Sequence, residues 1–150
     1  MSHTYTSIFI HTVFSTHNRN PYIHPALSER LHPYLGGIAR DHGFKALGIG
    51  GVEDHVHLLL SLPGSIHISK AVQLLKGGSS KWIHDTMPSS KDFSWQEGYG
   101  AFSIGASQVD DTLRYIAQQV DHHRQVTFQD EYRSFLTRHG IAIDERYVWG

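Results

Sequence analysis

The run HVHLLLSL at residues 55–62 constrains the fold of this chain more than any other feature. Side chains alternate between the two faces of a strand, so one face here would be entirely apolar, formed by Val56, Leu58, Leu60 and Leu62. His55 and His57 would share the opposite face, with their imidazoles side by side. Imidazole is a common ligand of divalent metals. The run therefore predicts both a strand on a buried core and a candidate metal site.

Strand-like and helix-like segments alternate around this run. Strand composition or alternation between glycines predicts strands at residues 4–15, 44–49, 55–62 and 98–105. Helical spacing of apolar residues predicts a helix from Leu27 to Ile38, with a kink or break at Pro33, and a second helix over 69–84. The order β-α-β-β-α-β is that of the ferredoxin-like fold, an α+β arrangement in which helices cover one face of an antiparallel sheet.

Composition limits the chemistry and the location of the protein. With 150 residues, 39% of them hydrophobic, the chain suits one compact domain over residues 1–150. It has no cysteine, which excludes disulfides, thiol nucleophiles and cysteine-based zinc sites. A metal would have to bind His, carboxylate or amide groups. No apolar stretch is long enough to span a membrane and no leader pattern is present, so we expect a soluble, cytoplasmic protein with no membrane partner.

A second polar constellation follows the last predicted strand. A capping-box pattern at 107–110 precedes an apolar helical stripe formed by Val109, Leu113, Ile116 and Val120. Tyr115 and Gln119 lie off this stripe, four residues apart, with Cβ atoms about 5–6 Å apart on a regular helix. A phenol and a neutral oxygen ligand on one helix face, combined with the paired histidines, suggest a metal-assisted tyrosine nucleophile. Another short helix is expected over 128–138.

The charge pattern points to a local basic surface. The formal net charge of −1 provides no general attraction to nucleic acid. Residues 55–84, however, contain no Asp or Glu and three lysines, Lys70, Lys76 and Lys81. These lysines, with Arg19 and Arg114, are the predicted contacts to DNA phosphates.

Each pattern also has an ordinary structural interpretation. In a chain with thirteen histidines, two of them on one strand face can simply be solvated. A tyrosine off an apolar stripe is usually a surface residue, and lysines along a helix usually form a solvated face. We interpret His122 and His123 as cations that favour a helix C-terminus, without a catalytic role.

Three sequence blocks carry a resemblance to a known family. The block WQEGYGAFS at 95–103, the block YIAQQ at 115–119 and the doublet His122-His123 resemble the single-tyrosine transposases of small bacterial insertion sequences. His55-Val56-His57 matches the histidine-hydrophobic-histidine motif after which the HUH superfamily is named. The resemblance covers roughly residues 5–149 and extends to the REP-associated tyrosine transposases.

The resemblance implies a fold, a reaction and a set of site residues. It implies a ferredoxin-like core whose C-terminal helix carries the tyrosine, a homodimer, and a divalent metal, Mg²⁺ or Mn²⁺. The implied reaction is cleavage and rejoining of single-stranded or hairpin DNA at insertion-sequence ends through a covalent 5′-phosphotyrosine. Tyr115 would be the nucleophile, and His55, His57 and Gln119 would hold the metal. In this family the tyrosine can act on the metal of the partner subunit, and the sequence leaves open whether it does so here.

Two other functions remain open at this stage. An HUH nickase or replication initiator would use the same residues, but such proteins are usually longer. A non-catalytic regulator that binds hairpin DNA would retain the fold without needing the tyrosine. The two classes differ in whether Tyr115→Phe abolishes a covalent DNA adduct.

Overall fold

A four-stranded antiparallel sheet forms the centre of the molecule. The computed structural model describes residues 3–150. The strands are β1 (Phe9–Ser15), β2 (Lys45–Val52), β3 (His55–Ser61) and β4 (Gly100–Ile104), in the spatial order β2-β3-β1-β4. Helices α1 (Pro25–Asp41) and α2 (Ile68–Thr86) complete the β-α-β-β-α-β order. The predicted ferredoxin-like α+β fold is confirmed.

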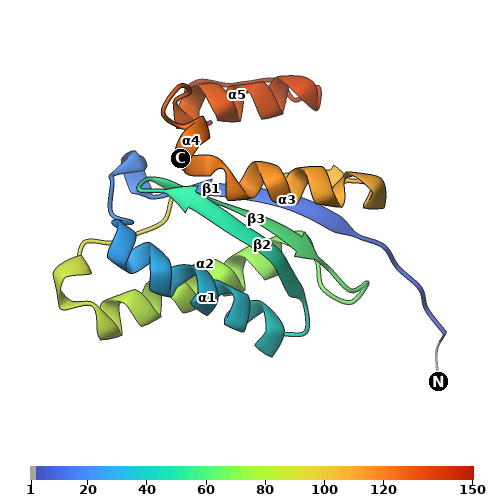
Figure 1. Ribbon diagram of the computed structural model, residues 1–150, viewed down its shortest axis with the longest axis horizontal. Coiled ribbons are helices and arrows are strands. Elements are labelled where there is room, and N and C mark those ends of the chain that lie inside the picture. Colours follow the sequence, from blue (N-terminus) through green and yellow to red (C-terminus); the bar gives the residue numbers. More distant parts are fainter. Residues whose placement is uncertain (1–2) are drawn as a thin grey trace.

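Helices α1 and α2 cover one face of the sheet (Figure 1). Pro25 occupies the first turn of α1, and Nδ1 of His24 accepts the Leu27 N–H at 3.2 Å. The main core lies between these helices and the inward residues of β1 and β3, which include Ile10, Phe14, Val56, Leu58 and Leu60. The apolar face predicted for residues 55–62 is therefore buried against helices, and burial of such side chains is a major source of stability.

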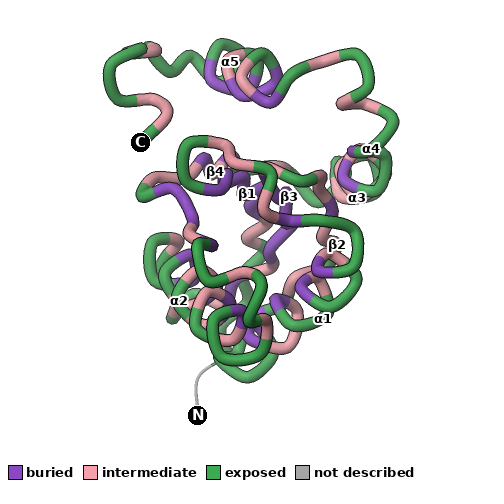
Figure 2. The backbone as a smooth tube through the Cα atoms, turned by 90° about the vertical axis from the view of Figure 1, so that its left-hand side faces the viewer, coloured by how far each residue is buried: buried purple, intermediate pink, exposed green. Residues whose placement is uncertain are grey.

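The C-terminal third covers the opposite face (Figure 1). It consists of α3 (Val109–Ala117), α4 (Gln119–His122) and α5 (Phe128–Arg138). Short 3₁₀ turns occur at His17–Arg19, at Pro88–Ser90 and, just before α3, at Ala106–Gln108. A smaller apolar cluster ties α5 to this face through Val13, Phe102, Phe128, Tyr132, Phe135 and Leu136. Both faces of β1 and β3 are thus covered, and these strands are buried in Figure 2. Among residues 3–150, no helix combines the length and apolar character needed to cross a bilayer.

Two predictions about the first half of the chain were wrong in detail. The first strand begins at Phe9 rather than at residue 4, because Phe9 already pairs with Ser61 and Ile104, the last residues of its two neighbour strands. Helix α1 continues through Pro33 without a break. Pro33 is exposed, so the carbonyl that loses its partner faces water, while Leu31 and Leu35 on the other side remain buried.

The helix predicted to carry both Tyr115 and Gln119 is interrupted. Helix α3 ends at Ala117, and α4 begins at Gln119 after a non-helical Gln118 with φ −100° and ψ 18°. The apolar stripe therefore does not extend to Val120, which is 58% exposed. The capping box expected at 107–110 is also absent. Instead, the Gly105 N–H donates to the side-chain oxygen of Gln108 at 2.9 Å.

Glycines on β2 allow α3 to lie close to the sheet. A Cβ at Gly50 would overlap the backbone carbonyl oxygen of Ile116, and a Cβ at Gly48 would overlap the side chain of Leu113. Both contacts come from α3, which packs against β2 and β3. Because these two residues of β2 are glycines, α3, which carries Tyr115, can lie closer to the sheet.

Candidate active site

His55 and His57 point into a buried space on the face covered by α3, α4 and α5. Neither side chain is exposed to solvent, and the ring centroids are 5.1 Å apart. Nδ1 of His55 donates to Asp54 Oδ1 at 2.7 Å, and Nδ1 of His57 lies 2.8 Å from Nε2 of His11. These partners orient both rings so that their Nε2 atoms face the same space, as in many metal sites.

A carboxylate from α5 enters this space. Oε1 of Glu131 lies 2.8 Å from Nε2 of His57, 3.1 Å from Nε2 of His123 and 3.5 Å from Nε2 of His55. Nδ1 of His123 donates to the Val126 carbonyl at 2.7 Å, which orients the third ring in the same sense. The Glu131 side chain is only 2% exposed. Three imidazoles thus surround one buried carboxylate oxygen.

Gln119 reaches the same space from the start of α4. It is 1% exposed, and its Oε1 lies 3.2 Å from Nε2 of His55. Its Nε2 lies 3.4 Å from the Tyr115 carbonyl. Gln119 therefore stays close to Tyr115 despite the interruption at Gln118. Its amide oxygen lies beside His55, as the predicted ligand set requires.

Tyr115 lies on α3, at the edge of the cluster. Its ring centroid is 5.7 Å from that of His57 in the same chain. The hydroxyl donates to Oε2 of Glu131, and Nε2 of His122 lies 3.3 Å from the hydroxyl oxygen. Burial, followed by the hydrogen bond to Glu131, raises the pKa of Tyr115 above its ordinary value, so the side chain is a neutral phenol at physiological pH.

The buried titratable groups differ in charge because their partners differ. Burial lowers the pKa of His57 to about 4, against the attraction of Glu131, and burial with the neighbouring His57 lowers that of His11 to about 3. Burial also acts on His55, but hydrogen bonds to Asp54 and Glu131 outweigh it and raise its pKa to about 9. Burial would raise the pKa of Glu131, yet its hydrogen bonds to His123, His55 and His57 hold that pKa far below the usual range. Glu131 is therefore an ionised carboxylate.

The donor atoms around His55 fit a divalent cation. Because Nδ1 of His55 donates to a carboxylate, Nε2 of the neutral ring carries a lone pair. That lone pair faces Gln119 Oε1 and Glu131 Oε1, which are both acceptors. A positive charge must stand among these atoms, supplied either by a proton on His55 or by a bound metal ion. Two imidazoles and an amide oxygen suit Mn²⁺ and its neighbours better than Mg²⁺, which prefers oxygen ligands.

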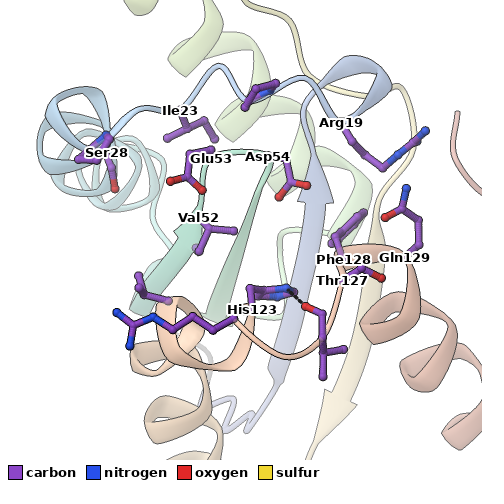
Figure 3. A pocket seen from close by; sticks show the side chains of 16 residues that line it. Arg19, Ile23, Ser28, Val52, Glu53, Asp54, His123, Thr127, Phe128 and Gln129 are labelled. Carbon is purple, nitrogen blue, oxygen red and sulfur yellow. Dashed lines mark hydrogen bonds between the residues drawn. The ribbon is translucent and has the colours of Figure 1, made fainter.

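Two pockets flank the cluster. The larger, of about 660 Å³, is lined by Asp54 and His123 on the side of the cluster and includes Arg19, Arg124 and Phe128 (Figure 3). The smaller, of about 300 Å³, is lined by Tyr115, His11 and Arg138. The cluster thus lies between two pockets, each with arginine in its wall, and such cationic walls attract anions.

Comparisons with known proteins identify the family. Residues 4–119 match the family model described as "Transposase IS200 like". The chain belongs to the IS200-like transposase family. It is 25% identical over 116 residues to the ISDra2 transposase TnpA of Deinococcus radiodurans, covering 74% of this chain and 83% of that protein.

Solved structures of transposases share the fold. A putative transposase from Deinococcus radiodurans R1 superposes with a TM-score of 0.64 at 21% identity, covering 79% of this chain and 95% of that one. A REP-associated tyrosine transposase bound to a REP hairpin superposes with a TM-score of 0.61 at 18% identity, covering 84% and 74%. Within this transposase, the family match includes His55, His57, Tyr115 and Gln119 and ends before His123 and Glu131.

The predicted DNA-binding cations are distributed over several surfaces. Arg19 lines the larger pocket, with its guanidinium 5.5 Å from the Trp149 ring centroid. Arg114 is exposed on α3 and pairs with Asp111. Lys70 and Lys81 are exposed on α2, across the sheet from Tyr115, and Lys81 pairs with Asp85 at 2.9 Å.

Lys76 differs from the other predicted cations because its ammonium group is already bonded. Nζ donates to the carbonyls of Gln96 at 2.8 Å, Gly98 at 2.5 Å and Glu97 at 3.2 Å. Burial lowers its pKa to about 8, against the attraction of Glu97. The ammonium group holds the loop before β4 in place.

The sequence interpretation missed Glu131 and His123. Glu131 stands three residues after Phe128 and four before Phe135, so it lies on the buried stripe of α5. A lone carboxylate on the apolar stripe of a helix is a signal in the sequence, because a buried charge needs a cationic or hydrogen-bonding partner. The sequence pattern favours a helix-terminal cation at His123, whereas the structure places this ring inside the cluster. Nothing in its local spacing identifies it as a neighbour of His55.

Proposed function

We propose that this transposase cleaves and rejoins single-stranded DNA at insertion-sequence ends, with Tyr115 as the nucleophile. The Tyr115 oxygen would attack the scissile phosphorus, forming a 5′-phosphotyrosine bond as the bond to the 3′ oxygen breaks. The tyrosine loses its proton, and the leaving 3′ oxygen gains one. The free 3′-hydroxyl can later reverse the step, so the strand is rejoined without ATP.

The observation that carries this proposal is the position of one phenol. Tyr115 is hydrogen-bonded to a carboxylate whose other oxygen lies among the Nε2 atoms of His55 and His57. The hydroxyl donates to Oε2 of Glu131, so this carboxylate holds the phenol oxygen beside the histidines. A structural tyrosine on an amphipathic helix would need no such setting. Because all these residues belong to one chain, we propose that Tyr115 can act in cis.

We propose that His55, His57 and Gln119 hold a divalent metal, Mn²⁺ or Mg²⁺. When bound, the metal withdraws charge from a non-bridging phosphate oxygen and so favours attack at phosphorus. Asp54 and His11 keep Nε2 of both imidazoles free to face the metal, because each occupies an Nδ1 atom. Burial beneath α5 excludes bulk water, which favours transfer to a DNA hydroxyl over hydrolysis.

The DNA partner we propose is single-stranded or hairpin DNA. A structural neighbour is a tyrosine transposase bound to a hairpin, which supports this choice. We propose that Arg19 contacts a phosphate at the larger pocket, and that Arg114, Lys70 and Lys81 contact phosphates farther from the scissile bond. Lys76 is left out because its ammonium group is bonded to three carbonyls. We also propose that residues 1–150 act as one domain in a homodimer.

A covalent-adduct assay tests the proposal. Labelled single strands from both flanks of the gene that encodes this chain would be incubated with Mn²⁺ and resolved on a denaturing gel. Wild type should give a protein-linked band that EDTA prevents. Tyr115→Phe should give none while still binding the hairpin, because only the nucleophilic oxygen is lost.

Three results would contradict the proposal. An adduct that persists in Tyr115→Phe would place the nucleophile elsewhere. Hairpin binding without an adduct, under every divalent metal tried, would favour a non-catalytic DNA-binding regulator. Cleavage at a fixed origin, without rejoining to a second end, would favour a nickase.

A further inference from the structure

Glu131 and His123 lie outside the family match but inside the cluster. The match ends at Gln119, and both residues follow it on the segment that leads into α5. The Glu131 side chain is almost fully buried, and its two oxygens lie among three imidazole rings and the Tyr115 phenol. This arrangement places a carboxylate where a cation could be bound.

The spacing of the donor atoms is that of ligands around one cation. Ligands bound at about 2.0–2.2 Å in octahedral or tetrahedral geometry lie about 2.8–3.6 Å from their nearest neighbours. The three distances from Glu131 Oε1 to imidazole Nε2 atoms are 2.8, 3.1 and 3.5 Å. One ligand atom from each of His55, His57, His123 and Glu131 lies within 4.8 Å of all the others. Small side-chain shifts would complete the geometry.

The hydrogen bond of His123 points to the same conclusion. Its Nδ1 donates to a backbone carbonyl, which cannot donate in return, so Nε2 of the neutral ring carries a lone pair. That lone pair is directed at a carboxylate oxygen 3.1 Å away. Nε2 of His55 faces two acceptors in the same way. A single divalent cation among the four side chains would satisfy both rings at once, in place of a proton on each.

We propose that Glu131 and His123 are metal ligands, which makes the centre one of three imidazoles and a carboxylate, with Gln119 beside it. This rests on the proposed function for the presence of a divalent metal. Such a ligand set selects Mn²⁺, Zn²⁺ or Fe²⁺ over Mg²⁺. Oε1 of Glu131 would bind the metal while Oε2 holds the Tyr115 hydroxyl, so one side chain connects the ligand set to the nucleophile.

Pulsed EPR of Mn²⁺ on the full chain, without DNA, counts the coordinated nitrogens directly. The proposal predicts three imidazole nitrogens, from His55, His57 and His123. A centre formed only by His55, His57 and Gln119 would show two. This measurement on the wild type does not depend on the folding of any variant.

Mn²⁺ titrations of variants give the second readout. Loss of an outer-shell partner already costs about 10–100-fold in metal affinity, so Glu131→Gln and His123→Ala should each weaken Mn²⁺ binding by about 100-fold or more. Glu131→Gln keeps the size and hydrogen-bonding capacity of the side chain. Asp130→Asn removes the neighbouring exposed carboxylate and His42→Ala an exposed histidine, and both controls should bind as wild type does.

The outcomes separate this proposal from the proposed function. Two coordinated nitrogens, unchanged Mn²⁺ affinity in both ligand variants, or no Mn²⁺ binding by the wild type would overturn the inference. If the adduct forms with a two-nitrogen centre, the inference fails while the function stands. If a three-nitrogen centre forms but Tyr115 never links to DNA, the inference stands while the function fails.

Discussion

The two faces of strand β3 differ more than any other two regions of the molecule. One face is formed by Val56, Leu58 and Leu60, which pack beneath α1 and α2 in the main core. The other carries His55 and His57, which pack beneath the C-terminal helices. All five side chains are fully buried. The two faces are therefore equally buried and differ in their side chains, which are apolar on one face and imidazoles on the other.

This contrast shows how one strand serves two purposes. On the apolar face, burial stabilises the fold through the hydrophobic effect, which needs no specific partners. On the histidine face, every buried nitrogen needs a directed partner, and Asp54, His11 and Glu131 supply them. We infer that substitutions on the first face act mainly on stability and that those on the second act mainly on chemistry.

The largest expected effect breaks the histidine face. His57→Ala should reduce the covalent DNA adduct below detection, because a proposed metal ligand beside Tyr115 is lost. Thermal unfolding should still show a cooperative transition, since the main core is untouched. The exposed control His42→Ala should form adduct as wild type does. Normal adduct yield from His57→Ala would end the distinction between the faces.

The next effect breaks the apolar face. Leu58→Ala should lower the free energy of unfolding by about 2–5 kcal/mol, because it leaves a cavity in a fully packed core. Urea titration measures this loss. Leu47→Ala, at a position 40% exposed on β2, is the control and should lose much less. A Leu58→Ala protein of normal stability would show that α1 and α2 are not the main source of stability.

A third change sharpens the comparison by moving α3. Gly50→Ala would press a methyl group against the Ile116 carbonyl and displace Tyr115. Because a misplacement of about 1 Å can cost about 10²-fold in rate, we expect a loss of that order in the rate of adduct formation.

Gly77→Ala is the matched control for Gly50→Ala. A Cβ there meets nothing within 4 Å, and alanine favours the interior of α2. Single-turnover kinetics compare the two variants. Equal rates would mean that the distance between α3 and the sheet does not position Tyr115.

The smallest expected effect concerns the outer shell of the histidine face. Asp54→Asn keeps the size of the side chain but removes the charge that orients His55, so Mn²⁺ affinity should fall by about 10–100-fold. Asp85→Asn, at an exposed pair with Lys81, is the control. Equilibrium dialysis measures both. An unchanged affinity would show that His55 needs no carboxylate partner.

Much of the fold followed from local patterns in the sequence. The alternation at residues 55–62 predicted both faces of β3, and the helix expected at 128–138 is α5 with the same bounds. Local patterns succeed here because each face buries one kind of side chain. They failed at Pro33, where exposure lets the helix continue, and at Gln118, where α3 ends although the apolar spacing continues to Val120.

The site was only partly predictable for a different reason. His55 and His57 are neighbours on one strand, so their grouping was visible from spacing alone. Glu131 meets His57 across 74 residues of sequence, and a contact of that range depends on how α5 is placed over the sheet. Its position on an apolar stripe marked it as unusual but did not identify its partner.

The central claim is that Tyr115 links covalently to DNA, and mass spectrometry of the adduct tests it most directly. Trypsin should cut after Arg114 and Arg124 and release residues 115–124, whose only phenol is that of Tyr115. After nuclease digestion of the wild-type adduct, the account predicts this peptide carrying a 5′-phosphorylated nucleotide on Tyr115. A nucleotide mapped to any other residue, or an adduct with no modified 115–124 peptide, would contradict it.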